Sequence, residues 1–435
     1  MKGPKVAYVL HWFPEPSETF IFNEVRYLHD GGLDLRIFTL YGELRNHLPP
    51  EMVSFAIRPE RLGMRYIPRV PHALAFWRGR LPGTLAGMFR HIPFRRWSDP
   101  EMAGEFLWGF FCGFELARRC VEENIAHIHA PWANGPATAA WVASRLSSIP
   151  FSFAARATDI YPPDGALAEK ISASCFVRTN NQANVEHLRG QALSEGDRRK
   201  IRLVYNGHPV RVSASAKVFM QPPFRLLALG RFVRKKGFDV LLKACQILRN
   251  QGLPIELTLA GDGPEGRRLK SLSRKLGLGD GVAFPGFVPY ERVPGLLDEA
   301  DVFIMPSVVD ASGDRDGLPN VIMEALLQKV PVVATNVCGI AEVIRDGVTG
   351  FLVPQNDPLA LAHAIVEMTR DRDRALRMAQ AGHDLVVERF AADRCFTAVR
   401  ELLERHALVG GPPSAMGCGP SPTGVASARG DAVSR

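Results

Sequence analysis

The chain has 435 residues and a formal net charge of +8; 46% of its residues are hydrophobic and 23% are charged. This composition is typical of a soluble globular protein with two or three domains, and no apolar run approaches the ~20 residues that cross a bilayer. The seven cysteines are scattered without CxxC spacing, so we expect reduced thiols in a cytosolic protein and neither a metal site nor a disulfide framework.

Strand-like and helix-like segments alternate in the first half. Residues 6–10 predict a buried strand, and no small-residue cleavage site follows them, so we expect no signal peptide. Residues 17–30 predict a helix that Ser17 caps and that two glycines end, and residues 35–40 predict the next strand. Such alternation is typical of a parallel sheet with helices on both faces.

A basic segment rich in aromatic residues follows at about 58–98. It holds nine arginines against one acid, and six aromatic residues are interleaved: Tyr66, Phe76, Trp77, Phe89, Phe94 and Trp97. Arginine and aromatic residues at this density suit an anionic membrane surface or a lipid phosphate group. A solvated basic face on a helical insertion and a nucleic-acid contact remain as other interpretations.

The second half repeats the alternation of strands and helices. Buried strands are predicted at residues 224–229, 255–260, 302–305 and 331–334, each followed by a turn with glycine or proline. Two doubly wound domains are therefore expected, with a boundary near 207–223 and a disordered tail over 409–435. The first domain would span residues 1–208, and the second 223–388.

Two short segments carry residues that suit a phosphate ligand. Asp316 and Glu324 lie eight residues apart, around a Gly and a Pro that suit a turn opening a helix. A helix start can hold a phosphate through its free N–H groups, and carboxylates can accept hydrogen bonds from sugar hydroxyls. Arg231 and Lys236 follow another predicted strand, where they could grip a diphosphate. Read alone, these residues could also be solvated charges and a turn former.

An ordered set of motifs over about 224–390 resembles the retaining glycosyltransferases of family 4, which have the GT-B fold. The motifs include Gly230-Arg231…Lys236-Gly237, Gly261-Asp262-Gly263-Pro264, Pro285-Gly286-Phe287-Val288, Met305-Pro306-Ser307, Asp316…Glu324 and Gly339-Ile340-Ala341-Glu342. The first half resembles the exopolysaccharide branch of that family (colanic-acid-type transferases) in residues 13–21, 127–130 and 151–161. The resemblance implies an α/β GT-B protein, in which two doubly wound Rossmann-like domains face a central cleft and helices at about 389–408 cross back to the first domain.

The resemblance also implies roles for individual residues. Phosphate binding and sugar binding at the reacting centre would fall to a catalytic set of Asp316, Glu324, Arg231, Lys236, His129 and Arg156. Donor binding would involve Arg231, Lys236, Gly286, Phe287, Val288, Asp316, Gly317, Leu318, Pro319, Asn320, Glu324 and Glu18. In this set the two cations and the amides near Gly317 hold the diphosphate, Glu324 the ribose and Asp316 the transferred sugar. The backbone around Phe287 reads the base, and His129 lies near the sugar or the acceptor.

Two positions depart from the family pattern. The family usually has Glu where this chain has Asp316, so we expect activity with an altered sugar preference. Relatives commonly have His where this chain has Arg156, and arginine cannot cycle a proton near neutral pH, although it can stabilise phosphate charge. These departures leave open a non-catalytic subunit that binds nucleotide sugars; a nucleotide-sugar epimerase on the same fold is another alternative.

The expected activity is that of a hexosyltransferase-type enzyme that moves a sugar from a nucleotide-diphosphate sugar to a glycan acceptor with retention. No metal and no other cofactor are expected. The expected acceptor is lipid-linked, with the protein in the cytoplasm and the segment at 58–98 in peripheral contact with the inner face of the membrane. No nucleic-acid partner is expected.

Overall fold

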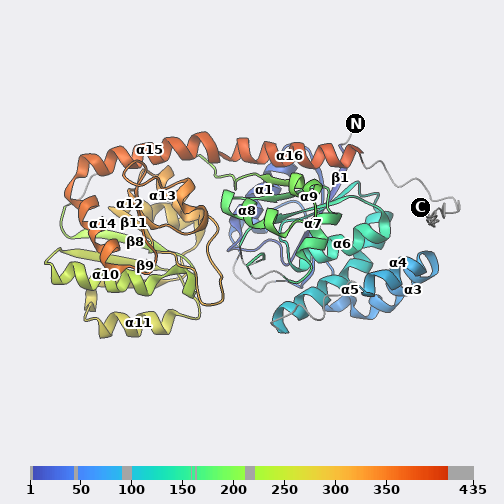
Figure 1. The fold of residues 1–435 in the computed structure, drawn as a ribbon, viewed down its shortest axis with the longest axis horizontal. Coiled ribbons are helices and arrows are strands. Elements are labelled where there is room, and N and C mark those ends of the chain that lie inside the picture. The colour runs from blue at the N-terminus through green and yellow to red at the C-terminus, as the bar shows by residue number, and fades with distance from the viewer. Residues whose placement is uncertain are drawn as a thin grey trace, which may run out of the picture.

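The computed structural model describes residues 3–43, 48–90, 100–157, 159–161, 164–210 and 221–409. They form two α/β lobes that lie side by side, with two long C-terminal helices running along both lobes (Figure 1). The predictions for Phe94, for Trp97, for most of the domain boundary (211–220) and for the tail beyond Val409 lie outside the described residues.

The first lobe is built on a seven-stranded parallel sheet with the order β3-β2-β1-β4-β5-β6-β7. Its strands are β1 (Lys5–Leu10), β2 (Asp34–Thr39), β3 (Glu60–Arg61), β4 (His127–Ala130), β5 (Phe151–Ala155), β6 (Val177–Thr179) and β7 (Ile201–Leu203). The winding direction reverses between β1 and β4, and ligands of doubly wound sheets gather at the carboxyl ends of the strands beside such a reversal.

Helices cover both faces of this first sheet. They are α1 (Thr19–Asp30), α2 (Pro50–Val53), α3 (Val70–Arg80), α4 (Pro82–Arg90), α5 (Pro100–Glu122), α6 (Gly135–Ser147), α7 (Leu167–Ala173), α8 (Gln182–Gln191) and α9 (Glu195–Lys200). The prediction that Ser17 caps the first helix is wrong. Glu18 occupies the cap position without a side-chain bond, because the Ser17 hydroxyl donates to Glu15 at 2.8 Å instead.

The second lobe is built on a six-stranded parallel sheet with the order β10-β9-β8-β11-β12-β13. Its strands are β8 (Phe224–Leu229), β9 (Ile255–Ala260), β10 (Val282–Gly286), β11 (Val302–Met305), β12 (Val332–Thr335) and β13 (Phe351–Val353). Its helices are α10 (Phe238–Asn250), α11 (Gly266–Lys275), α12 (Val293–Glu299), α13 (Asn320–Leu327) and α14 (Pro358–Arg370). Here the winding reverses between β8 and β11, whose apolar runs are buried on both faces as expected for central parallel strands. Two doubly wound domains were predicted, and this prediction is confirmed.

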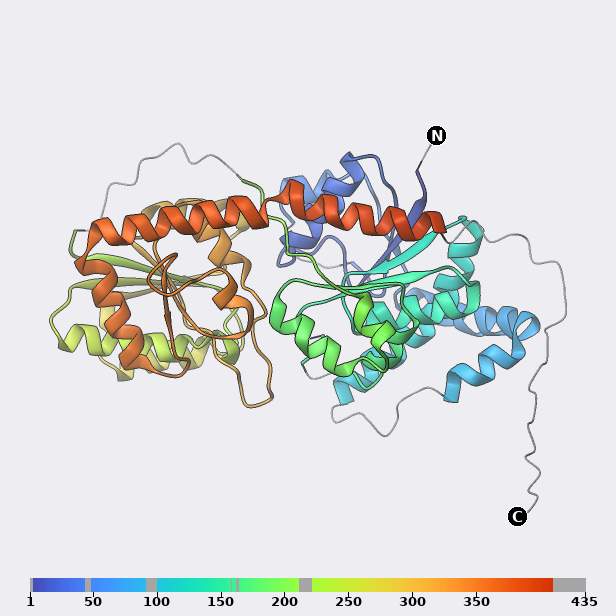
Figure 2. The ribbon, with the colours of Figure 1, turned by 45° about the horizontal axis from the view of Figure 1, so that its top comes forward.

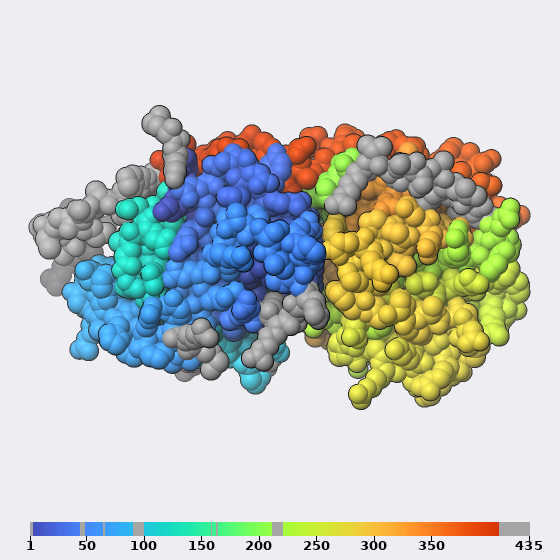
Figure 3. Space-filling view, turned by 180° about the vertical axis from the view of Figure 1, so that it is seen from behind, coloured from blue at the N-terminus to red at the C-terminus, as the bar shows by residue number. Residues whose placement is uncertain are grey.

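The last two helices join the lobes. The first of them, α15 (Arg372–Phe390), places Phe390 in the core of the second lobe. The next, α16 (Ala392–Val409), buries Val399 and Leu403 in the core of the first lobe. Seen from behind, these helices lie across the top of both lobes (Figure 3).

The basic segment is only partly what the sequence suggested. Its helices α3 and α4 pack beside α5, and Trp77 is buried there, with its indole N–H donating to the Phe114 carbonyl at 3.0 Å. Trp77 therefore cannot face a membrane. Arg78 and Arg80 are exposed on the same helix. In the described part of the chain, no helix combines the length and apolar character that a membrane span needs.

Candidate active site

A bonded group of three side chains stands at the winding reversal of the second sheet. Lys236 follows β8, while Ser307 and Asp316 follow β11. Asp316 is buried, and its Oδ2 atom accepts from Lys236 Nζ at 2.9 Å and from Ser307 Oγ at 2.7 Å. Its Oδ1 atom forms no hydrogen bond with the described residues. The group therefore holds a cation and a carboxylate oxygen ready at the edge where ligands of this fold bind.

The start of α13 lies next to this group. Pro319 occupies its cap position, and no side chain caps the first turn that begins at Asn320. The preceding Gly317 and Leu318 are buried. Uncapped amides at a helix start attract anions, so this turn can hold phosphate oxygens beside Lys236.

Glu324 lies one turn into α13 and is partly buried. Burial raises the pKa of its carboxyl to about 7, and no described residue gives it a hydrogen bond. Arg231, in contrast, is exposed, and its side chain has no ion pair within the described ranges. The structure therefore brings Lys236 and Asp316 into contact. Within the described ranges, neither Glu324 nor Arg231 forms a side-chain bond to them.

The segment expected to read the base ends strand β10. Gly286 has a φ of +83°, a left-handed conformation that favours glycine, and its carbonyl accepts from the amide of Gly261 at 2.8 Å. The Phe287 side chain that follows is 64% exposed, and Val288 packs partly against the core. An exposed aromatic ring at the end of this strand suits a planar base.

Two ionisable residues lie at the carboxyl edge of the first sheet, near its winding reversal. Glu18 lies after β1, and burial raises the pKa of its carboxyl to about 7 although His11 and Arg156 act in the other direction. Arg156 follows β5 and is buried, with Nη1 donating to the Pro131 carbonyl. Burial lowers the pKa of its guanidinium to about 10, so it stays charged at neutral pH.

His129 does not lie in the cleft, and the prediction that placed it near the sugar or the acceptor is corrected. His129 belongs to strand β4 and is fully buried, and the centroid of its ring lies 5.0 Å from that of Tyr8 and 6.1 Å from that of Phe176. Its Nδ1 atom shares a 2.8 Å hydrogen bond with Ser152 Oγ. Burial lowers the pKa of His129 well below its ordinary value, which leaves a neutral core side chain.

The two lobes touch at the segment between β11 and α13, which lies at the boundary between them (Figure 2). A Cβ atom on Gly317 would lie 2.8 Å from the Arg156 carbonyl oxygen, and one on Gly339 would lie 2.5 Å from Asn181 Cβ. Glu342 also accepts a hydrogen bond from the Gln182 amide at 2.6 Å. Small residues are therefore required where the lobes meet.

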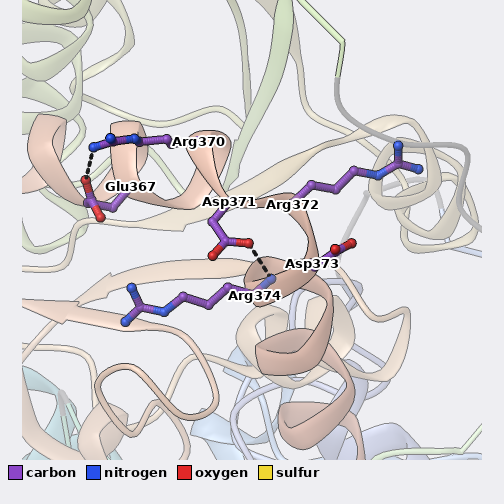
Figure 4. Close-up of a pocket in the computed structure, with 6 residues that line it drawn as sticks. All are labelled: Glu367, Arg370, Asp371, Arg372, Asp373 and Arg374. Carbon is purple, nitrogen blue, oxygen red and sulfur yellow. Dashed lines mark hydrogen bonds and ion pairs between the residues drawn. The ribbon is translucent and has the colours of Figure 1, made fainter.

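A wide surface hollow of about 680 Å³ lies elsewhere, at the turn between α14 and α15 (Figure 4). It is lined by equal numbers of acids and arginines: Glu367, Arg370, Asp371, Arg372, Asp373 and Arg374. Asp371 caps the Arg374 amide, and Glu367 pairs with Arg370. This balance gives the hollow no net preference for an anion. Over the described ranges, no group of three or more His, Cys, Asp or Glu side chains is arranged to hold a metal ion.

Sequence reasoning gave no role to several residues at the two reversals. Ser307 was quoted only as part of a motif, although its place directly after a strand signals a side chain at the ligand edge. Trp132 and Glu105 were missed because their proximity to Arg156 and His11 depends on how the loops and α5 pack. Local spacing does not encode such contacts.

A family model described as "Glycosyl transferases group 1" matches residues 215–384. The putative colanic acid biosynthesis glycosyltransferase WcaL of Salmonella typhimurium is 29% identical over 381 residues, which cover 84% of this chain and 91% of WcaL. The amylovoran biosynthesis glycosyltransferase AmsK of Erwinia amylovora is 34% identical over 199 residues, covering 46% of this chain and 49% of AmsK.

Solved structures agree on the fold. HepE of Anabaena, crystallised with UDP and glucose, aligns with a TM-score of 0.67 at 17% identity over 92% of this chain and all of HepE. Sucrose-phosphate synthase of Thermosynechococcus elongatus aligns with a TM-score of 0.67 at 18% identity, covering 93% of this chain and all of the synthase.

The two parallel-sheet lobes thus have the GT-B fold. The chain is similar to the group 1 glycosyl transferases over residues 215–384, and it is a nucleotide-sugar-dependent glycosyltransferase of the hexosyltransferase type.

Proposed function

We propose that this protein moves a sugar from a nucleotide-diphosphate sugar to a lipid-linked glycan in exopolysaccharide or cell-surface polysaccharide synthesis, with retention at the anomeric carbon. The observation that carries the proposal is the bonded group of Lys236, Asp316 and Ser307 beside the uncapped start of α13. The names of the similar proteins, colanic acid and amylovoran glycosyltransferases, support the kind of product.

In the proposed mechanism the second lobe stabilises the departing diphosphate. Lys236, Arg231 and the amides near Gly317 supply positive charge where negative charge develops, which is usually the largest single catalytic contribution. Glu324 accepts hydrogen bonds from the ribose, and the Oδ1 atom of Asp316, which has no partner among the described residues, accepts one from the transferred sugar. The leaving phosphate takes the proton of the acceptor hydroxyl. The proposal needs no metal, because these groups already supply the charge.

The acceptor glycan is proposed to bind on the first lobe, at a row of partly buried aromatic rings. Trp12 stacks on Tyr41 with 4.6 Å between centroids, and Tyr41 on Trp108 with 6.3 Å. Beside them His11 Nε2 lies 2.5 Å from a carboxylate oxygen of Glu105. That hydrogen bond offsets the effect of burial and lowers the pKa of Glu105. Apolar ring faces next to a fixed polar pair suit the faces and hydroxyls of a pyranose.

Peripheral membrane contact is proposed through α3. Arg78 and Arg80 are exposed, and Ile67 just before the helix is 45% exposed. Exposed arginines with apolar neighbours favour anionic lipid surfaces. The double variant Arg78→Glu with Arg80→Glu is expected to reduce sedimentation with phosphatidylglycerol vesicles, while neutral phosphatidylcholine vesicles serve as the control. Equal sedimentation of both proteins would remove this part of the proposal.

Incubation with radiolabelled nucleotide sugars and a bacterial lipid extract tests the activity. Label that passes from the donor to the lipid fraction supports transfer. Donor binding without turnover would favour the non-catalytic subunit that Arg156 and Asp316 suggest. Conversion of the free donor to its epimer would instead favour the epimerase.

A further inference from the structure

Arg156 carries a buried positive charge with unused hydrogen-bond donors. Its side chain is 4% exposed, and Nη1 donates to the Pro131 carbonyl. The other two guanidinium nitrogens, Nε and Nη2, have no hydrogen-bond partner in the described part of the chain. Buried donors without acceptors raise the free energy of the folded state, so these two nitrogens favour a further acceptor.

The acids around Arg156 are already engaged or lie without contact. Asp159 uses its carboxylate oxygens to accept from three backbone N–H groups, including that of Arg156 itself. Glu24 pairs with Arg178 at 2.6 Å. Glu18 forms no ion pair with Arg156, and burial raises its pKa to about 7, so at neutral pH only part of it is charged. The guanidinium charge is therefore not matched by contact with an acid among these residues.

Two aromatic rings fix the place of the guanidinium. Its central carbon lies 4.9 Å from the centroid of Phe20, in the first turn of α1, and 5.4 Å from that of Trp132, in the loop after β4. The backbone carbonyl of Arg156 abuts Gly317, the residue after Asp316. The backbone of Arg156 thus lies where the first lobe meets the loop that is proposed to hold the transferred sugar, and its guanidinium lies against Phe20 and Trp132.

We propose that Arg156 binds a carboxylate on the transferred sugar, so that the donor is a nucleotide-diphosphate hexuronic acid. This inference rests on the proposed function, since it assumes that the donor sugar lies beside Asp316. The planar guanidinium matches a carboxylate in two parallel hydrogen bonds, which a neutral sugar does not offer. The donor diphosphate is assigned to Lys236 on the other lobe, which leaves the fork of Arg156 for a different anionic group.

Isothermal titration calorimetry with matched donors tests the inference. The pairs are UDP-glucuronic acid against UDP-glucose and GDP-mannuronic acid against GDP-mannose. With the base that the protein prefers, the acidic donor is expected to bind about tenfold or more tightly than the neutral one. Arg156→Gln should remove this preference while affinity for UDP or GDP stays within about twofold. Arg156→Lys should restore part of it, and Arg199→Gln, at an exposed arginine, should leave it intact.

Each other outcome has a defined meaning. Equal or tighter binding of the neutral donor by the unmodified protein overturns the inference, and this comparison needs no variant to fold. If Arg156→Gln still prefers the acidic donor, Arg156 is not the group that binds the carboxylate. Geranyl diphosphate serves as a probe for the diphosphate of a lipid-linked acceptor. If Arg156→Gln weakens binding of this probe but leaves the donor preference unchanged, Arg156 binds the acceptor, and its assignment to the donor sugar is wrong. Failure of UDP and GDP alike to bind would instead contradict the proposed function.

Discussion

The two lobes present differently prepared edges to the space between them. In the second lobe Lys236, Asp316 and Ser307 already bond to one another. In the first lobe Arg156 and Glu18 form no ion pair with each other, and burial displaces the pKa of each. The proposed phosphate site of the second lobe is therefore held together by its own hydrogen bonds, whereas Arg156 and Glu18 of the first lobe are not held by each other. Organised charge that needs no rearrangement is what stabilises a developing anion most.

Removal of Lys236 should have the largest effect on this comparison. Lys236→Ala is expected to lower kcat/KM by about 10²–10³-fold, because the departing diphosphate loses a fixed cation. Lys235→Ala is a matched control, since the neighbouring Lys235 pairs with Asp314 at 3.0 Å and has no part in the bonded group. Equal losses in both variants would mean that the charge of the segment, and not the placed ammonium, matters.

A methyl group at the contact between the lobes should have the next largest effect. In Gly317→Ala the new Cβ would approach the Arg156 carbonyl to 2.8 Å, so the lobes must shift. We expect a destabilisation of about 1–3 kcal/mol in chemical unfolding and a clear loss of kcat. Gly295→Ala has open space around its Cβ inside α12, so it should leave kcat unchanged and, through the higher helix propensity of alanine, raise stability by about 0.5–1 kcal/mol. An unchanged Gly317→Ala enzyme would show that the lobes do not meet there during turnover.

Glu324 should make stability fall with rising pH. Its pKa is about 7 in the folded protein against an ordinary value of 4.5, so between these values the unfolded chain loses a proton that the folded one keeps. The free energy of unfolding therefore decreases across that window. Glu324→Gln should be more stable than the unmodified protein by roughly 1–3 kcal/mol at pH 8 and about equal at pH 4. Urea unfolding at both pH values measures this, and identical differences at pH 4 and 8 would contradict it.

The aromatic row of the first lobe should affect the acceptor and not the donor. Trp12→Ala removes the ring that stacks on Tyr41. We expect the KM for the acceptor to rise about fivefold, while calorimetric affinity for the donor is unchanged. The exposed Leu193→Ala, on the same lobe, is the control. If Trp12→Ala instead raises the dissociation constant of the donor, the ring contacts the donor, and its assignment to the acceptor is wrong.

The smallest effect on activity is expected at His129. Because the ring is buried against Tyr8 and Phe176, His129→Asn should lower the melting temperature yet leave kcat/KM within about twofold. Activity is measured well below the melting temperature of both proteins. A loss of a hundredfold with an unchanged melting temperature would restore a direct catalytic role.

The sequence predicted the sheets well, but in the first lobe it misplaced His129. Strands β8, β9 and β11 occur at the predicted residues, because continuous apolar runs ended by glycine or proline leave few alternatives for a buried parallel strand. Lys236 and Asp316 meet because each follows a strand beside the same winding reversal. His129 was misjudged since strand position alone does not tell whether a side chain points into the core or ends at the edge.

The structure of a complex with the preferred nucleoside diphosphate tests the central claim most directly. We predict the diphosphate against Lys236 and the first amides of α13, with the ribose hydroxyls on the Glu324 carboxylate. A nucleotide seated on the first sheet, or one bound in the second lobe without contact to Lys236, would contradict the account.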